Sequence, residues 1–233
     1  MKFFKKTALA LALTAALTTG CFAAEAFHCA YLQGFPDGTI RPETAVTRAE
    51  LAQILYRMMD EAARKSASDT ECGFLDLGPA HWAYPAISAL VKLRLMLGGT
   101  DGRFRPDDGV TGQELSIVLE RVRASEVGRE ALPELAAGWS AQSVSFADGN
   151  GWVMGLHDGV FSKEQALTRA ELAQIFNRIL GRSPENLSDL LIGMPLFSDN
   201  LDTRTQYFLA LQEAVVDHTA KVAGDHEIWT GLG

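Results

Sequence analysis

Two arginines in this sequence occupy positions where a positive charge is unfavourable for the helix but suitable for binding an anion. Arg48 and Arg169 each follow the threonine of an eight-residue segment, Thr-Arg-Ala-Glu-Leu-Ala-Gln-Ile, which occurs at 47–54 and again at 168–175. If a helix begins at that threonine, the arginine lies in its first turn, where the helix dipole disfavours positive charge. A guanidinium can donate two parallel hydrogen bonds to a carboxylate. We therefore favour anion binding by both arginines over a structural salt bridge, the alternative that the sequence leaves open.

The arginine segments belong to a longer repeat that has three copies. Residues 34–57, 98–121 and 155–178 align without a gap, and in each copy an Asp-Gly pair begins ten residues before a threonine. A repeat of this kind indicates one structural unit used several times. Seven aligned positions hold the same residue in every copy: Gly34/Gly98/Gly155, Asp37/Asp101/Asp158, Gly38/Gly102/Gly159, Thr47/Thr111/Thr168, Glu50/Glu114/Glu171, Leu51/Leu115/Leu172 and Arg57/Arg121/Arg178.

Each copy predicts an ordered loop followed by a capped helix. Thr47 and Glu50 form the Ser/Thr-x-x-Glu pattern of a capping box, and apolar residues then recur at helical spacing. Gly34 is expected to stop a preceding helix in the left-handed conformation that glycine tolerates. Asp37-Gly38 has the composition of a turn. The unit is therefore predicted to be a front helix, a glycine stop, a loop and a capped back helix.

The front helix is marked by aromatic residues. Trp82 lies sixteen residues before Gly98, and Trp139 lies sixteen before Gly155. The segment 74–76, Phe-Leu-Asp, opens the second unit, and residues 197–199, Phe-Ser-Asp, repeat that opening near the C-terminus. The C-terminal segment is therefore expected to supply the front helix that the first unit lacks.

With these residues in view, the chain resembles the S-layer homology domain family. The resemblance rests on residues 34–42 followed by 47–50, on 74–76 with Trp82, and on 98–106, and it covers nearly all of the chain after residue 26. It implies helical units that bind an anionic secondary cell-wall polysaccharide, often pyruvylated, in grooves between neighbouring units.

The resemblance also implies which residues meet the sugar. The arginine of the family's Thr-Arg-Ala-Glu segment contacts the acidic sugar, and the middle copy lacks it because Gly112 and Gln113 stand in place of Arg-Ala. Trp82 and Trp139 match a family tryptophan that lies near the groove, and burial in the core is an equal alternative for them. Gly34 and Phe35 match loop residues that offer backbone and ring contacts to the sugar, and turn formation is an equal alternative. The expected ligand-binding residues are Arg48, Arg169, Gly34, Phe35, Trp82 and Trp139.

We expect an all-α fold, a closed pseudo-threefold assembly of helix-loop-helix repeats in which the helix around Tyr207 packs beside the helix that begins at Thr47. Joining the ends in this way removes an exposed flank. The expected boundaries are a signal peptide at 1–26, a first unit at 27–60 with only loop and back helix, a second at 74–124, a third at 131–181, and a C-terminal half-unit at 196–233.

The first 26 residues have the form of an export signal. Lys2, Lys5 and Lys6 precede an apolar stretch too short to span a bilayer, and Ala-Glu-Ala at 24–26 fits a cleavage site. Lipidation at Cys21 is the less favoured alternative. No later stretch is apolar enough for membrane insertion. In an oxidising compartment Cys29 and Cys72 either pair or stay free, and we predict a disulfide between them.

Composition and motifs exclude several classes of function. Removing the leader leaves 18 basic against 28 acidic side chains, about −10, so a nucleic-acid partner is not expected. No nucleophile elbow, zinc-protease motif or phosphate loop occurs, and the Asp-Gly loops lack the ligand pattern of an EF-hand. The spacing of His218, His226 and Glu227 matches no standard metal site, so neither metal nor cofactor is expected. The predicted function is non-catalytic cell-wall binding; the alternatives are a structural protein with decayed grooves or a glycan hydrolase.

Overall fold

The computed structural model describes residues 25–68, 71–140, 164–182 and 184–233, with the side chains of 139 and 140 also left out. Residues 1–24, which hold most of the predicted signal peptide and Cys21, lie outside the described part, as do the third Asp-Gly loop and the Trp139 side chain. Its helices are α1 (Arg48–Met58), α2 (Glu61–Ala67), α3 (Tyr84–Lys92), α4 (Gly112–Ala124), α5 (Glu126–Ala131), α6 (Pro133–Ser140), α7 (Arg169–Leu180), the 3-10 helix η1 (Leu187–Asp189) and α8 (Phe208–Val215). Its strands are β1 (Ala26–His28), β2 (His218–Ala223) and β3 (His226–Leu232).

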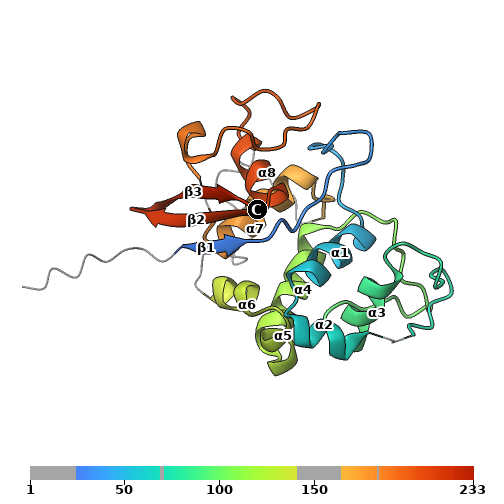
Figure 1. The fold of residues 1–233 in the computed structure, drawn as a ribbon. Helices are drawn as coiled ribbons and strands as arrows, with labels where there is room; N and C mark the ends of the chain where they lie inside the picture. The colour runs from blue at the N-terminus through green and yellow to red at the C-terminus, as the bar shows by residue number, and fades with distance from the viewer. Residues whose placement is uncertain (1–24, 69–70, 141–163, 183) are drawn as a thin grey trace, which may run out of the picture.

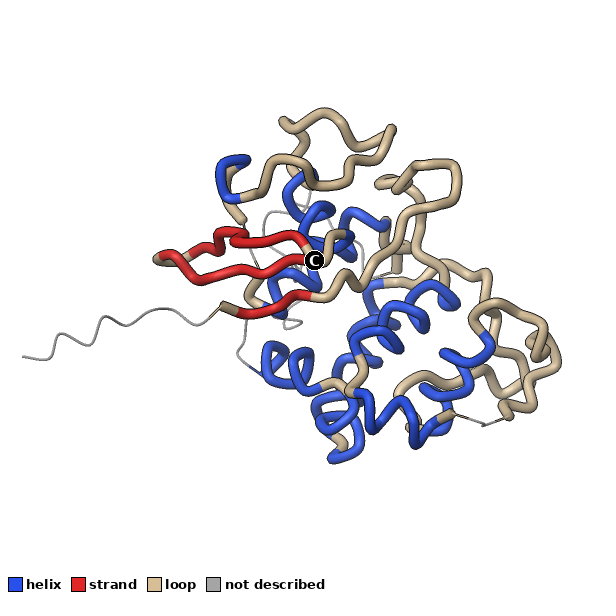
Figure 2. Tube along the Cα trace, in the orientation of Figure 1, coloured by secondary structure: helices blue, strands red, loops and turns tan. Residues whose placement is uncertain are grey.

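The chain is mostly helical, but the all-α expectation is wrong. The three strands form one antiparallel sheet in the order β1-β2-β3, and they gather at one side of the molecule (Figures 1 and 2). The hairpin turns at Gly224-Asp225, with Gly224 at φ +78°. A Gly-Asp pair between runs that contain β-branched and aromatic residues is a hairpin signal. The sequence therefore carried this signal at a place where only a chain end was expected.

The three back helices begin where the repeat predicts. Thr47, Thr111 and Thr168 are the N-caps of α1, α4 and α7, and each forms a complete capping box with the glutamate three residues later. In each box the threonine hydroxyl accepts the glutamate's backbone N–H, and the glutamate carboxylate accepts the threonine's N–H. The capping prediction is confirmed, and it needs no arginine, since α4 begins with Gly112.

The segments before these helices meet at the centre of the molecule. Val46 N–H donates to Leu167 O, Leu167 N–H to Val110 O, and Val110 N–H to Val46 O, each over 2.8 Å. All three side chains are buried. The three backbone bonds form a closed ring, which brings the N-termini of α1, α4 and α7 together.

Each back helix is covered by the next front helix along the chain. Helix α3 packs against α1, α6 against α4, and α8 against α7. The expectation that the Tyr207 helix packs beside the Thr47 helix is therefore wrong: α3 occupies that place. Helix α8 is held to α7 by Asn177, whose amide donates to Ala210 O over 2.9 Å while its oxygen accepts the Tyr31 hydroxyl over 2.6 Å.

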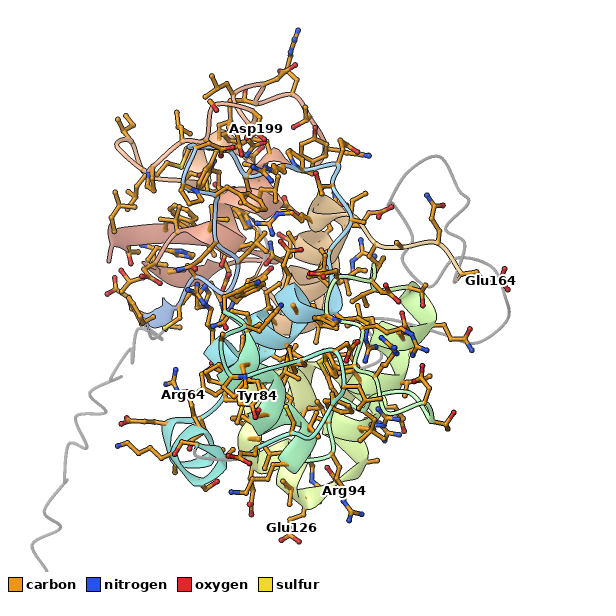
Figure 3. The ribbon with its side chains drawn as sticks, turned by 90° about the vertical axis from the view of Figure 1, so that its right-hand side faces the viewer. Arg64, Tyr84, Arg94, Glu126, Glu164 and Asp199 are labelled. Atoms are coloured by element: carbon orange, nitrogen blue, oxygen red, sulfur yellow. The ribbon has the colours of Figure 1, made fainter. Side chains whose placement is uncertain are left out.

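The C-terminal segment nevertheless contacts the first loop. Asp199 accepts the backbone N–H groups of Ile40 and Arg41, each over 2.8 Å, and Figure 3 labels it on that segment. In the second unit Asp76 accepts the equivalent groups of Phe104 and Arg105, also over 2.8 Å. The two loops are thus held by the same arrangement, although one acidic residue is 28 positions away in sequence and the other 159.

Gly34 has a different role from the one expected. No helix precedes it within residues 25–33, and the positive-φ glycines of the first two described loops are Gly38 at +80° and Gly102 at +75°. A Cβ on Gly34 would lie 2.0 Å from the ring of Phe197, and one on Gly98 would lie 2.2 Å from Phe74. Glycine is required here because an aromatic ring packs directly on the backbone.

The predicted disulfide is also wrong. Cys29 is exposed, Cys72 is buried, and both are free thiols. The Cys72 sulfur lies 3.0 Å from the Ser88 hydroxyl, inside the core. None of the described helices combines the length and the apolar character that crossing a bilayer requires.

Candidate functional site

One pocket brings together four of the six residues expected to bind ligand. Its volume is about 180 Å³, which suits one sugar residue or its substituent better than a drug-sized ligand, for which sites are roughly 300–1,000 Å³. Gly34 and Phe35 come from the first loop, Trp82 from the turn before α3, and Arg169 from α7. The remaining lining residues are Tyr31, Leu32, Gln33, Glu50, Gln53, Ile54 and Arg57.

Arg169 forms the buried wall of this pocket. Its side chain is 3% exposed and donates to Glu50 over 3.0 Å, to Ile40 O over 2.7 Å, and to Gln33 O. Burial lowers the pKa of this guanidinium and the carboxylate of Glu50 raises it; an arginine remains charged nonetheless. Arg169 therefore holds the first loop against α7, and most of its hydrogen-bonding capacity is already in use.

Arg48 makes the equivalent contacts one unit further on. It donates to Glu114 over 3.3 Å, to Phe104 O over 2.9 Å and to Leu97 O over 2.8 Å. Its side chain is 14% exposed. Arg48 is not in the pocket described above, and it holds the second loop as Arg169 holds the first. Both arginines form the structural salt bridge that the sequence left as the alternative: Arg48 with Glu114 and Arg169 with Glu50.

Two aromatic residues shape the open side of the pocket. Trp82 is 60% exposed, with its ring stacked on His81 at a centroid distance of 5.7 Å. Phe35 lies under two guanidinium groups, 3.8 Å from that of Arg41 and 4.9 Å from that of Arg169. An exposed indole beside a small pocket offers a flat apolar face with a polar N–H, the combination suited to a sugar ring. Trp139 is in α6, and its side chain is outside the described part.

Arg57 is the pocket residue that the site prediction missed. It is half-buried in the last turn of α1, and among the described residues its guanidinium has neither an ion pair nor a hydrogen bond. Burial lowers the pKa of Arg57, and the charge of Asp217 raises it. A partly buried cation that has no hydrogen bond or close ion pair attracts an anion. The signal was present in the sequence, because Arg57, Arg121 and Arg178 are identical in the three copies.

The chemistry of the pocket favours binding over catalysis. Glu50 is the one carboxylate among its lining residues, and it is already engaged by Arg169 and by the Thr47 cap. Hydrolysis of a glycosidic bond normally needs a pair of carboxyl groups on either side of that bond. The pocket instead combines an unpaired guanidinium, an exposed indole and loop backbone.

Comparison with known proteins adds a family and several relatives. Residues 31–52 and 73–116 match the S-layer homology domain. Cell surface glycoprotein 1 of Acetivibrio thermocellus is 28% identical over 218 residues, which cover 88% of this chain and 9% of the glycoprotein. The cellulosome-anchoring protein of the same organism is 28% identical over 202 residues, covering 84% of this chain and 44% of the relative.

An enzyme is also among the relatives. The amylopullulanase of Thermoanaerobacterium thermosulfurigenes is 27% identical over 165 residues, which cover 65% of this chain and 8% of the enzyme. This chain thus spans less than half the length of each of these three relatives. Similarity to so small a part of an enzyme gives no argument for catalysis here.

Proposed function

We propose, from the S-layer homology sequence that this chain carries, that it is a cell-surface protein that attaches non-covalently to a bacterial cell wall by binding secondary cell-wall polysaccharide. The family match and the two surface proteins of Acetivibrio thermocellus indicate the cell-surface location. The polysaccharide, its anionic and in some cases pyruvylated character, and the residues that bind it are the parts that we infer.

The observation that carries the proposal is the convergence of Trp82, Arg57, Arg169 and the first loop on one pocket. Arg57 supplies the charge for a ligand carboxylate, and Trp82 supplies a face for the sugar ring. Arg169 keeps the Gly34–Phe35 backbone in place beside them. Because the protein after leader removal carries about −10, attraction to an anionic polymer must be local.

We extend the proposal to three units with pseudo-threefold symmetry. The ring of bonds among Val46, Val110 and Leu167 supports it, as do the parallel helix pairs α1–α3, α4–α6 and α7–α8. In this arrangement segments 27–60 and 196–233 together form one unit, beside units at 74–124 and 131–181. The groove at Arg48 is then a second site, and Gly112 leaves the third without its arginine.

The test is sedimentation of the purified protein with cell-wall sacculi, before and after the secondary polymer is stripped. Arg57→Gln should weaken binding roughly ten- to a hundredfold, the value of a charge-assisted contact. Trp82→Ala should weaken it up to roughly tenfold through the lost aromatic face. Arg94→Gln removes the same charge from an exposed position in the α3–α4 connection and should bind like the parent.

Three results would contradict the proposal. Equal sedimentation with stripped sacculi would exclude the polymer as ligand. Equal losses in Arg57→Gln and Arg94→Gln would reduce the effect to net charge. Failure of the parent to sediment at all would favour the structural alternative, in which the grooves have decayed, and release of reducing ends from the wall would favour the hydrolase.

A further inference from the structure

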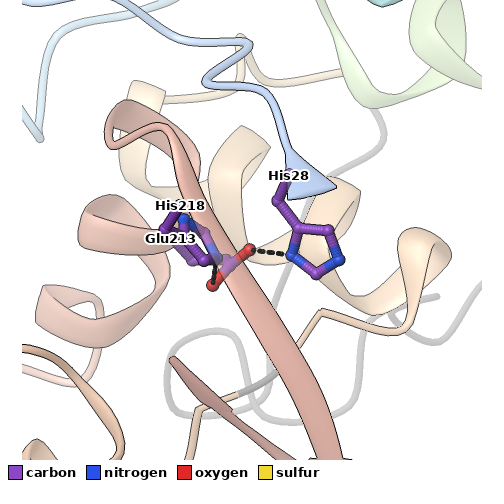
Figure 4. Close-up of side chains that lie close together, drawn as sticks. All are labelled: His28, Glu213 and His218. Atoms are coloured by element: carbon purple, nitrogen blue, oxygen red, sulfur yellow. Dashed lines mark hydrogen bonds and ion pairs between the residues drawn. The ribbon is translucent and has the colours of Figure 1, made fainter. Parts of the chain in front are cut away.

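A second cluster of chemically active side chains lies away from the pocket beside Trp82, where β1 pairs with β2. It joins His28 of β1, Glu213 of α8 and His218 of β2, and Figure 4 shows the three side chains converging. His28 Nδ1 lies 3.1 Å from Glu213 Oε1, and His218 Nε2 lies 3.1 Å from Glu213 Oε2. All three are buried, with Glu213 and His218 fully inaccessible.

The hydrogen bonding of His218 leaves one ring nitrogen facing the carboxylate without a bond. Its Nδ1 lies 2.7 Å from the carbonyl oxygen of Val216, so Nδ1 carries a proton and donates it. In the neutral ring, Nε2 is then a lone pair directed at Glu213. That nitrogen is close enough for an ion pair, yet it has no hydrogen bond of acceptable geometry. A fully buried lone pair beside a carboxylate oxygen is unfavourable unless a cation lies between them.

Each of the three side chains also has an outer partner of the kind that metal ligands use. His218 donates to a backbone carbonyl, and His28 Nε2 lies 3.7 Å from the carboxylate of Glu227. Trp229 Nε1 donates to Glu213 Oε2 over 2.9 Å, which leaves Oε1 turned toward His28. Metal-bound histidines almost always donate their second nitrogen to a carbonyl or carboxylate, and bound carboxylates are hydrogen-bonded in turn.

The carboxylate of Glu213 is fixed by three neighbouring side chains. His28 Nδ1 and His218 Nε2 each lie 3.1 Å from one of its oxygens, and Trp229 Nε1 donates to Oε2 over 2.9 Å. By contrast, the other group of this kind among the described residues, Glu185, Asp225 and His226, is largely exposed.

We propose that His28, Glu213 and His218 form a structural site for a divalent transition-metal ion of the Zn²⁺ class. Two imidazole nitrogens and one carboxylate oxygen, all within 4.8 Å of one another, are a donor set that Zn²⁺ accepts with water as the fourth ligand. The ligands come from β1, α8 and β2, and His28 is 185 residues from Glu213. The ion would therefore join the first strand to the C-terminal sheet and stabilise the closed chain.

The first test is metal content. Tag-free protein is treated with chelator, exchanged into metal-free buffer, reloaded with Zn²⁺ and passed over a desalting column before elemental analysis. We expect about one Zn²⁺ per chain. Zn²⁺ buffered a hundredfold above its dissociation constant should raise the unfolding temperature on the order of 5–10 °C. Loading with Co²⁺ should give the visible absorption bands of a four-coordinate ion.

Substitutions then show which residues bind the ion. His218→Gln and Glu213→Gln should lose the bound ion and its thermal shift, while His226→Gln, a change in the neighbouring exposed cluster, should retain both. Less than a tenth of an ion per chain in the parent would overturn the proposal, and the cluster would then be a buried imidazolium–carboxylate network. Loss of the ion in His226→Gln with retention in folded His218→Gln would also overturn it, by moving the ion to the exposed cluster.

Discussion

Two arginines that line the pocket beside Trp82 differ in what surrounds them. Arg169 is buried and donates to a carboxylate and two carbonyl oxygens. Arg57 lines the same pocket but has no hydrogen bond or ion pair among the described residues, and only the charge of Asp217 acts on it. A buried cation with satisfied donors stabilises the fold, and an unsatisfied one at a pocket is available to a ligand. The two roles are therefore separable by measuring stability and binding on the same variants.

We predict opposite phenotypes for substitutions at these two residues. Arg169→Lys keeps the charge but loses the planar fork, so the free energy of unfolding should fall by about 1.5–3 kcal/mol. Arg57→Gln should change it by less than about 0.5 kcal/mol while weakening polymer binding. Urea denaturation and sacculus sedimentation measure the two effects. A large loss of stability in Arg57→Gln would mean that this arginine is structural as well.

The site residues differ in how far sequence reasoning could identify them. The repeat and the family resemblance together pointed to Gly34, Phe35, Trp82 and Arg169, and the structure places these around one pocket. Arg57 was visible as an identical column, but sequence could not show that its charge is unpaired. The cluster of His28, Glu213 and His218 could not be predicted from the sequence, because His28 and His218 come near each other only when β1 pairs with β2.

At the level of elements, the structure confirms the helix starts predicted from local patterns, whereas it confirms the predicted long-range packing only in part. The capping boxes at Thr47, Thr111 and Thr168 involve residues three apart, so the pattern alone determined where the helices begin. The role of Gly34 depends on a ring 163 residues later, and no local pattern contains that information. The same limit explains why α8 was placed beside the wrong helix: its apolar face does not identify the helix it covers.

The cap of the middle helix offers a clean test of this local chemistry. Thr111→Ala removes the hydroxyl that accepts the Glu114 N–H, so unfolding free energy should fall by about 1 kcal/mol. Thr111→Ser retains the oxygen and should recover most of the loss. Chemical denaturation of the three proteins provides the comparison. Equal stability of the alanine variant and the parent would show that the capping box contributes nothing here.

The loop-closing carboxylate of Asp76 predicts a dependence on pH. Burial raises its pKa, but the backbone N–H groups of Phe104 and Arg105 outweigh that effect, so the pKa is lowered in the folded protein. A lowered folded pKa gives stability that is present above the unfolded value, about 3.9, and is lost as pH falls through the folded value. Asp76→Asn should therefore be less stable than the parent at neutral pH, and the difference should shrink below about pH 4.

Thermal unfolding of both proteins from pH 7 down to pH 3 measures this difference. Asp101→Asn is a suitable control, because Asp101 lies in the same loop and its carboxylate is turned to the exposed side chain of Arg105. A parent-to-variant difference that stays constant over the whole range would contradict the assignment.

At the scale of the whole molecule, residues 26–41 and residues 197–232 pack together. Phe197 packs on Gly34 and Asp199 caps the first loop, while β1 pairs with β2 and α8 packs on α7. A sheet and a loop are thus shared between segments that are 190 and 159 residues apart in the sequence, taking His28 with His218 and Ile40 with Asp199. The molecule is closed by side chains and strands rather than by a disulfide, since Cys29 and Cys72 are free.

This closure predicts that two distant phenylalanines have matched effects. Phe197→Ala and Phe74→Ala each remove the ring that packs on a loop glycine, and each should cost roughly 2–3 kcal/mol, somewhat below the value for a fully buried phenylalanine. Both should unfold in a single transition by circular dichroism and tryptophan fluorescence. If Phe197→Ala unfolded like the parent while Phe74→Ala did not, the C-terminal segment would contribute nothing to the first unit.

The contact between Phe197 and the first loop also affects the order in which segments of the chain fold. A ribosome delivers the loop at 34–42 early, yet the ring that packs on Gly34 and the carboxylate that accepts the Ile40 amide arrive more than 150 residues later. Until then the loop at 34–42 lacks these two contacts, and its backbone groups stay solvated. Contacts so far apart in sequence make folding slow. We therefore expect the loop at 34–42 to reach its native conformation late in folding.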